Sequence, residues 1–258
     1  MSNGFQVADS PYFLEMMRNI KLTLEYDGTN FSGWQWQPKD RTVQATLQHA
    51  VTKLLQETPK IYAAGRTDSG VHALGQVANF ETVSELDLTS IHLGLNSYLP
   101  PDVVVLEAED VGDEFHARYS AVKRVYRYVI SKRFRAVTRN YSWFCKYALD
   151  AERIRDASRH LVGEHVFTAF CRESDEEPHY LSNVESLKWT ETEDSLILQI
   201  CANRFLHSMV RIIVGTMVDV GRGRIEPDEV KNILESQDRN RAGFSVPPQG
   251  LFLEKVFY

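Results

Sequence analysis

Segments with the two-residue period of β-strands alternate with segments of helical period along almost the whole chain, and this alternation limits the fold more than any other feature. The predicted strands cover 21–26, 61–64, 76–80, 103–106, 124–130, 184–189, 196–200 and 251–257, and the predicted helices cover 43–55, 89–98, 150–163, 205–219 and 227–234. No Pro/Gly/Ser-rich linker interrupts the series. The pattern therefore predicts an α+β protein whose two halves pack against each other.

The sign of the charge changes abruptly near His116, which is our candidate boundary between the halves. Residues 81–114 contain nine acidic and no basic residues, whereas residues 116–140 contain eight basic and no acidic ones. We call 116–140 the basic segment. The expected division is 1–18 as an N-terminal extension, 19–115 as the first half and 116–258 as the second half.

The basic segment interleaves cations with aromatic rings, as does a surface that binds nucleic acid through phosphate contacts and base stacking. Its basic residues are Arg118, Lys123, Arg124, Arg127, Lys132, Arg133, Arg135 and Arg139, and the aromatic residues among them are Tyr119, Tyr126, Tyr128 and Phe134. A solvated, charged pair of strands explains the same pattern. The formal net charge of −6 argues against a polyanionic partner only if the charges are evenly spread.

Cysteine content and the N-terminus bear on the cellular setting. Cys145, Cys171 and Cys201 are far apart and form no Cys-x-x-Cys pair, so neither a disulfide framework nor a zinc site is encoded. No apolar run approaches the roughly 18 residues of a membrane helix, and a signal-peptide pattern is missing. We expect a cytoplasmic protein without a metal or a membrane segment, whose native chain begins at Met1 or at Met17.

The densest candidate for chemistry is Ala64-Gly65-Arg66-Thr67-Asp68-Ser69-Gly70-Val71-His72-Ala73, which directly follows a predicted strand. The glycines at 65 and 70 permit a tight loop and the close approach of another chain, with the carboxylate of Asp68 between them. Asp-Ser-Gly is also the sequence of an ordinary turn, so the loop by itself does not establish catalysis.

Further motifs accompany this loop in a fixed order: Leu24-Glu25-Tyr26-Asp27-Gly28 with Gly33-Trp34-Gln35, Phe115-His116-Ala117-Arg118 with Tyr126-Arg127-Tyr128, Gly163-Glu164-His165 with Phe167-Thr168, His207-x-Met209-Val210-Arg211-x-Ile213-Val214-Gly215, and Gly250-Leu251. With the loop, they resemble the TruA family of tRNA pseudouridine synthases from Met17 onward. The resemblance implies two RRM-like or ferredoxin-like α/β halves that share a central, mostly antiparallel sheet flanked by helices. It also implies a homodimer, no cofactor, and conversion of uridine to pseudouridine at positions 38, 39 and 40 of the tRNA anticodon stem-loop.

The resemblance assigns the chemical roles residue by residue. Asp68 is the catalytic carboxylate, which must be ionised to act as nucleophile or base. Arg211 matches a position expected to form an ion pair with it, and such a cation favours the ionised state. Tyr126 matches the active-site tyrosine, whose ring stacks on the displaced uracil and whose phenol is a candidate acceptor of the C5 proton.

Substrate binding falls to three basic residues. The target nucleotide lies in or beside a paired stem and must be flipped out, at a cost that contacts to the RNA backbone offset. Arg66 is assigned to phosphate contact or base extrusion, and Lys123 and Arg124 of the basic segment to further contacts with the substrate.

Three histidines lie inside the motifs without an assigned chemical step. We expect His72 and His116 to pack loops. His207 and Arg211 are four residues apart on the predicted helix 205–219, so they are expected to lie together on its flank.

Two alternatives to a tRNA enzyme stay open: a non-catalytic RNA-binding paralogue, against which the complete set of catalytic residues argues, and a synthase of the same family with a different RNA target. The order of steps is open as well. Asp68 attacks the ribose C1′, attacks the uracil ring or removes the 2′ proton, and each of these requires a carboxylate.

Overall fold

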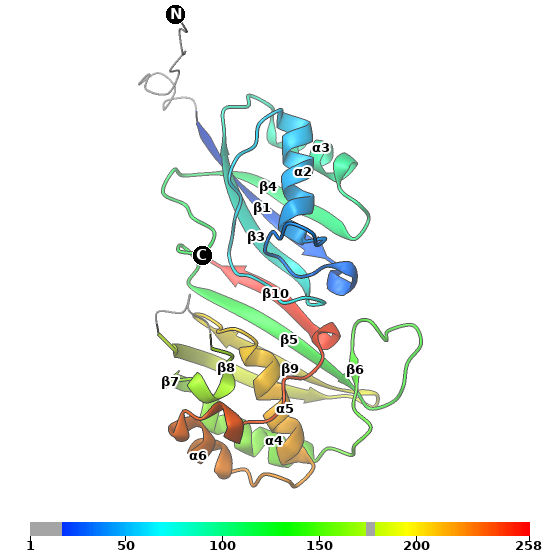
Figure 1. The fold of residues 1–258 in the computed structure, drawn as a ribbon, viewed down its shortest axis with the longest axis vertical. Helices are drawn as coiled ribbons and strands as arrows, with labels where there is room; N and C mark the ends of the chain where they lie inside the picture. The colour runs from blue at the N-terminus through cyan, green and yellow to red at the C-terminus, as the bar shows by residue number, and fades with distance from the viewer. Residues whose placement is uncertain (1–16, 174–178) are drawn as a thin grey trace, which may run out of the picture.

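The computed structural model describes residues 17–173 and 179–258, so the expected extension 1–18 lies outside the described residues except for Met17 and Arg18. The described residues form one ten-stranded sheet and five α-helices (Figure 1). The α+β class with a central, mostly antiparallel sheet flanked by helices is confirmed. None of the described helices is both long and apolar enough to span a bilayer.

The elements lie close to the predicted segments, with shifted ends. The strands are β1 (Arg18–Tyr26), β2 (Tyr62–Ala63), β3 (His72–Thr82), β4 (Val103–Val111), β5 (Lys123–Ser131), β6 (Trp143–Phe144), β7 (Gly163–Val166), β8 (Leu181–Glu191), β9 (Ser195–Ala202) and β10 (Leu251–Phe257). The helices are α2 (Val43–Leu55), α3 (Leu88–Tyr98), α4 (Ala151–Ser158), α5 (Met209–Gly221) and α6 (Glu229–Ser236). β6 and β7, strands of two and four residues, are absent from the prediction.

The C-terminal strand β10 lies at the centre of the sheet, between β3 and β5, and the strand order is β4-β1-β3-β10-β5-β9-β8-β7. It runs parallel to β3, with Phe252 opposite His72, and antiparallel to β5, with Leu253 opposite Tyr126. The start of β3 and the middle of β5 are thus one strand apart, about 10 Å at the usual strand spacing. The loop that leads into β3 is thereby brought near Tyr126.

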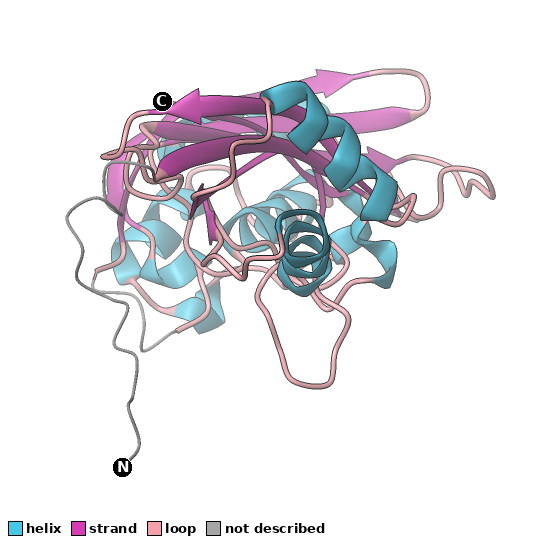
Figure 2. Ribbon diagram, turned by 90° about the horizontal axis from the view of Figure 1, so that it is seen from above, coloured by secondary structure: helices cyan, strands magenta, loops and turns pink. Residues whose placement is uncertain are grey.

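The helices gather mostly on one side of the sheet (Figure 2), which we call the helix side. In β1, Ile20, Leu22 and Leu24 are fully buried, whereas the two residues between them are partly exposed. In β5, Tyr126 and Tyr128 are buried in the same alternating manner. Because alternate strand residues point to opposite faces, the burial pattern places Tyr126 on the helix side.

Three of the helices have a side-chain cap at their first turn. Thr42 caps α2, Asp87 caps α3 and Asp150 caps α4, each accepting a hydrogen bond from a backbone N–H of the first turn. No side chain caps the start of α5 or of α6. The start of α5 therefore differs from the rule although a serine, Ser208, stands there.

Candidate active site

Residues 65–71, which we call the motif loop, connect β2 to β3 and are held in place by the chain that follows β1. The amide of Trp34 donates to the carbonyl of Thr67 at 3.0 Å, and the amide of Gly70 donates to the carbonyl of Phe31 at 3.2 Å. Main-chain bonds at both ends fix the loop independently of its own side chains. This rigidity suits a loop that must aim one carboxylate.

The motif loop is also held by a close contact between Val71 and Gly28. A Cβ at Gly28 would lie 2.0 Å from the carbonyl oxygen of Val71, so only glycine allows this approach. The buried hydroxyls of Tyr26 and Thr67 lie 2.8 Å apart and hydrogen-bond to each other. Burial raises the pKa of Tyr26 to about 12. The hydrogen bond to Thr67 lowers this pKa but does not offset burial, so the phenol stays neutral.

Asp68, at the centre of the motif loop, is bound through one of its oxygens. Nη1 of Arg211 lies 2.8 Å from Oδ2, and the hydroxyl of Ser208 donates to the same oxygen at 3.1 Å. Nε2 of His207 is 3.8 Å from the other oxygen, Oδ1. The structure thus brings Arg211 to Asp68, and it adds Ser208, which the sequence analysis missed.

The position of Arg211 depends on the segment that follows α6. Its Nε donates to the carbonyl of Val246 at 2.8 Å, which leaves Nη1 directed at Asp68. That segment lies directly against α5, because a Cβ at Gly215 would be 1.8 Å from the carbonyl oxygen of Phe244. The glycine in this motif therefore has a packing reason: it lets the segment that orients the arginine approach the helix.

Tyr126 lies on the helix side of β5 with 8% of its surface exposed, and its ring is nearly perpendicular to that of Phe205 at a centroid distance of 4.9 Å. Burial, Tyr26 and the charge of Asp68 all raise the pKa of Tyr126. The phenol is therefore neutral at physiological pH. Only β10 separates β5, which carries Tyr126, from the start of β3, which directly follows the motif loop with Asp68.

Arg124 is two residues before Tyr126 and, by strand alternation, on the same side of β5. Its two terminal nitrogens donate four hydrogen bonds, to the carbonyls of Ala64, Arg118, Ala121 and Asn203 at 2.7 to 3.1 Å. Burial lowers the pKa of this guanidinium. Arg124 thus ties the strand before the motif loop to two other segments, and its terminal N–H groups are engaged by the protein itself.

Lys123 and Arg66 are the two other basic residues that the sequence assigns to substrate binding. Lys123 points to the face of β5 opposite Tyr126, where its ammonium is 3.0 Å from the carboxylate of Glu185. The structure therefore does not bring Lys123 to Asp68. Arg66, in the motif loop, is exposed at the surface.

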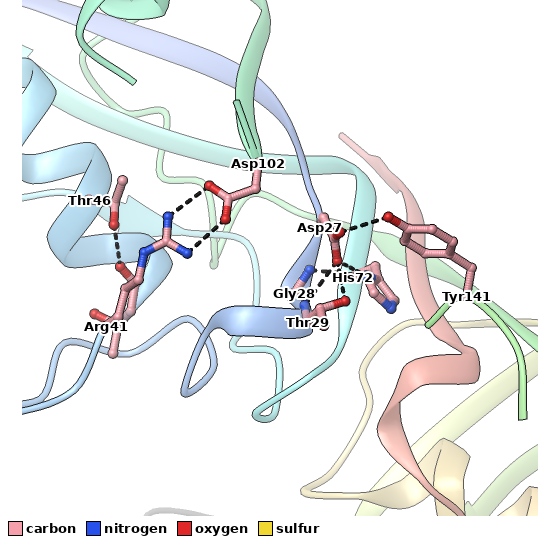
Figure 3. A network of polar contacts seen from close by, with 9 residues as sticks. Asp27, Gly28, Thr29, Arg41, Thr46, His72, Asp102 and Tyr141 are labelled. Carbon is pink, nitrogen blue, oxygen red and sulfur yellow. Dashed lines mark hydrogen bonds and ion pairs between the residues drawn. The ribbon is translucent and has the colours of Figure 1, made fainter. Parts of the chain in front are cut away.

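His72 connects the first half to the loop between β5 and β6 (Figure 3). Its Nδ1 accepts from the amide of Gly28 at 3.0 Å, and its Nε2 is 2.9 Å from the carbonyl of Asn140. Asp27 lies 3.1 Å from the same Nδ1 and accepts from the hydroxyl of Tyr141 at 2.8 Å. Burial lowers the pKa of His72, against the pull of Asp27, so the ring is neutral and packs loops, as expected.

His116 also holds a loop. Its Nδ1 accepts from the amides of Arg118 and Tyr119, and its ring lies between the rings of Tyr62 and Tyr119, each at a centroid distance of 4.5 Å. Burial and the nearby cations lower the pKa of His116. The expected packing role fits these contacts.

The rest of the basic segment is largely paired with carboxylates. Lys132 lies 2.7 Å from Glu191, and Arg133 and Arg135 both contact Asp194. These pairs tie the start of the β5–β6 loop to the end of β8 and to the turn between β8 and β9. Within the described ranges, no cluster of three or more His, Cys, Asp or Glu side chains could hold a metal ion.

Comparison with known proteins adds the reaction class to this geometry. A family model described as tRNA pseudouridine synthase matches residues 23–120 and 157–258. The tRNA pseudouridine synthase A of Thermoanaerobacter sp. is 46% identical over 244 residues, which cover 94% of this chain and 100% of the relative. Proteins of that name from Bacillus subtilis and Bacillus pumilus are 44% and 43% identical over 243 residues, 93% of this chain and 98% of each relative.

The family model covers most of the chain, and the relatives match it at nearly full length. The residues matched by the family model include Asp68 of the motif loop and Arg211 of α5, which lie 2.8 Å apart in the fold. The chain therefore belongs to the TruA family of tRNA pseudouridine synthases.

Proposed function

We propose that this protein converts uridine to pseudouridine at positions 38, 39 and 40 of the tRNA anticodon stem-loop, with Asp68 as the catalytic carboxylate. The observation that carries the proposal is the Asp68 carboxylate, which Arg211 and Ser208 hold through one oxygen while the other oxygen accepts from neither. A fixed, charge-paired carboxylate beside a buried aromatic ring is what a reaction on a flipped base requires.

The chemistry has to break the bond between uracil N1 and ribose C1′, turn the base, form the bond from C5 to C1′ and remove the C5 proton. The chain's own groups supply a carboxylate at Asp68 and a cation at Arg211. An ionised Asp68 serves all three routes: attack on C1′, attack on the uracil ring and removal of the 2′ proton. Arg211 favours that ionised form.

Tyr126 supplies the surface for the displaced base. Its phenol keeps its proton at neutral pH, because burial raises its pKa. Stacking of a base on such a ring is worth about 1 to 3 kcal/mol. We expect Tyr126→Phe to keep most of the turnover and Tyr126→Leu to lose about tenfold or more. An equal loss in both variants would instead support the phenol as the C5 proton acceptor.

Arg66 is exposed in the motif loop two residues before Asp68, which fits phosphate contact or base extrusion. For Lys123 and Arg124 we propose weaker contributions to substrate binding, since Lys123 faces away from Tyr126 and Arg124 is bound to four carbonyls. Removing a phosphate contact should reduce the slope of log affinity against log salt by about one unit. We expect this for Arg66→Gln and a smaller change for Lys123→Gln.

We extend the proposal to the assembly. Residues 19–115 and 116–258 each form an RRM-like or ferredoxin-like half, two copies make a homodimer, and the tRNA substrate assigns the enzyme to the cytoplasm. Each half contributes strands to the shared sheet and has helices of its own, which supports the division. Light scattering should give twice the chain mass of 29.6 kDa, and a mass of one chain would contradict the dimer.

The target positions are tested with unmodified tRNA transcripts that keep uridine at only one of positions 38, 39 and 40. After incubation with the protein, pseudouridine is mapped by chemical modification and primer extension. We expect product at each of the three positions. Product only outside the anticodon arm would support a synthase with another RNA target, and binding without product would support a non-catalytic RNA-binding paralogue.

A further inference from the structure

Ser208 stands at the start of α5 but does not cap it. A serine at a helix start usually accepts a hydrogen bond from a backbone N–H of the first turn, as Thr42 does at the start of α2. The hydroxyl of Ser208 makes no such bond and donates instead to Oδ2 of Asp68 at 3.1 Å. The side chain that sequence rules would assign to the helix is therefore directed at the carboxylate.

The backbone of Ser208 is in the left-handed region, with φ 59° and ψ 10°. Among the described residues other than glycine, only Gln56 and Gln237 share a positive φ, and both follow the last turn of a helix, where this conformation is ordinary. Ser208 precedes a helix and is 7% exposed. Unfavourable backbone conformations of this kind persist where the surrounding structure enforces them, often at functional sites.

The two oxygens of Asp68 differ as a result. Oδ2 receives both Nη1 of Arg211 and the hydroxyl of Ser208, whereas Nε2 of His207 lies 3.8 Å from Oδ1, beyond hydrogen-bonding distance. One donor would leave the carboxylate freer to rotate about its Cβ–Cγ bond. A second donor to the same oxygen restricts this rotation, with Oδ1 left to meet the substrate.

We propose that Ser208 is a positioning residue that fixes the rotation of the Asp68 carboxylate so that Oδ1 faces the target uridine. The inference rests on the proposed role of Asp68 as the catalytic carboxylate. It gives Ser208 no contact with the RNA. Its loss therefore affects the chemical step and leaves the binding of tRNA unchanged.

The test compares Ser208→Gly, Ser208→Ala and Ser208→Asn with the wild type in steady-state assays on tRNA transcripts. Glycine removes the hydroxyl and adopts a positive φ without strain, so it separates the hydrogen bond from the backbone conformation. Asparagine tolerates a positive φ and brings an amide donor. We expect Ser208→Gly and Ser208→Ala to lower kcat about tenfold at unchanged KM, and Ser208→Asn to recover most of the loss.

Thr42→Ala is the matched control, because it removes a hydroxyl that does cap its helix. We expect it to lower the thermal midpoint and to leave kcat unchanged. Ser208→Gly should keep the midpoint of the wild type or exceed it, so this variant decides the question even if Ser208→Ala unfolds. Wild-type kcat in Ser208→Gly would overturn the inference, as would a loss that Ser208→Asn fails to recover.

Asp68→Asn is assayed in the same experiment, because it tests the proposed catalytic role of Asp68 separately from the inference about Ser208. If Asp68→Asn keeps wild-type turnover, the proposed catalytic role of Asp68 is wrong and the role of Ser208 falls with it. If Asp68→Asn is inactive while Ser208→Gly is fully active, only the inference about Ser208 is wrong.

Discussion

The motif loop and the basic segment both border the candidate active site, but they are held in different ways. Main-chain hydrogen bonds from Trp34 and Gly70 and the close contact at Gly28 fix the loop, and its one carboxylate meets partners from the other half. In the basic segment, cations alternate between the two faces of β5, and Lys132, with the arginines that follow it, pairs with carboxylates.

This difference shows why a run of basic residues in the sequence does not by itself predict a basic surface in the fold. Strand alternation sends neighbouring residues such as Lys123 and Arg124 to opposite faces, and nearby carboxylates neutralise others. A loop fixed by glycines and main-chain bonds has no such alternation and can direct one side chain into a site.

The largest effect is expected for a methyl group added at Gly28. Its Cβ would lie 2.0 Å from a main-chain oxygen of the motif loop, so the loop has to shift. We expect Gly28→Ala to cost about 3 kcal/mol in the free energy of unfolding and to abolish most of the turnover. Gly65→Ala is the matched control within the loop, since a Cβ there meets nothing within 4 Å. Equal denaturation midpoints for both variants would show that the loop is not held as described.

The next effect separates the two neighbours in the basic segment. Arg124→Gln and Lys123→Gln each remove one positive charge, but only the first breaks hydrogen bonds to four carbonyls around the site. We expect Arg124→Gln to cost about 2 to 3 kcal/mol of stability and to lower kcat, because Ala64 and Asn203 lose a shared donor. Lys123→Gln should keep both the thermal midpoint and kcat. Equal loss of tRNA affinity with unchanged stability in the two variants would favour a common role as phosphate contacts.

The smallest effect is a pH dependence of stability at the junction of the two regions. Burial lowers the pKa of His72 in the folded chain, so below about pH 6.5 the unfolded chain binds a proton that the folded chain does not. Stability should therefore fall as the pH drops from 7.5 to 5.5. The pKa of Asp27 is also lowered, because bonds from Thr29 and Tyr141 outweigh its burial, so this carboxylate stays ionised throughout that window.

The measurement is the midpoint of chemical denaturation at several pH values in the wild type and in His72→Gln. His116, whose pKa is lowered as well, acts in the same direction, so His116→Gln serves as the control for a histidine outside the junction. We expect the fall between pH 7.5 and 5.5 to shrink in His72→Gln. An unchanged pH profile in that variant would show that His72 does not hold a neutral ring against Asp27.

Much of the site could be predicted because its residues stand in motifs that resemble those of the TruA family. Asp68 and Arg211 were assigned through that resemblance, and the structure brings them to 2.8 Å. The predicted helix began at 205, yet α5 begins at Met209, so His207 precedes it and reaches Asp68 from the connecting turn. A periodic pattern gives the helix but not its first residue, because the residues before the first turn can be apolar too.

Other features needed the fold. A serine before a helix is the usual cap, so nothing in the sequence directs Ser208 toward Asp68, and its positive φ appears only in the structure. The bonds of Arg124 depend on carbonyls from distant segments, which no local pattern shows. The direction of Lys123 could have been predicted from the sequence. It stands an odd number of residues before the buried Tyr126, and in a strand such residues point to opposite faces.

The central claim is that Asp68 performs the chemistry while the surrounding residues hold it. Single-turnover assays of the wild type and Asp68→Asn, with excess enzyme and unmodified tRNA, test it most directly when the dissociation constant for tRNA is measured in parallel. Asparagine keeps the size of the side chain and removes its charge. The account predicts tRNA binding like that of the wild type and no pseudouridine from Asp68→Asn. Pseudouridine formed by Asp68→Asn at the wild-type rate would contradict it.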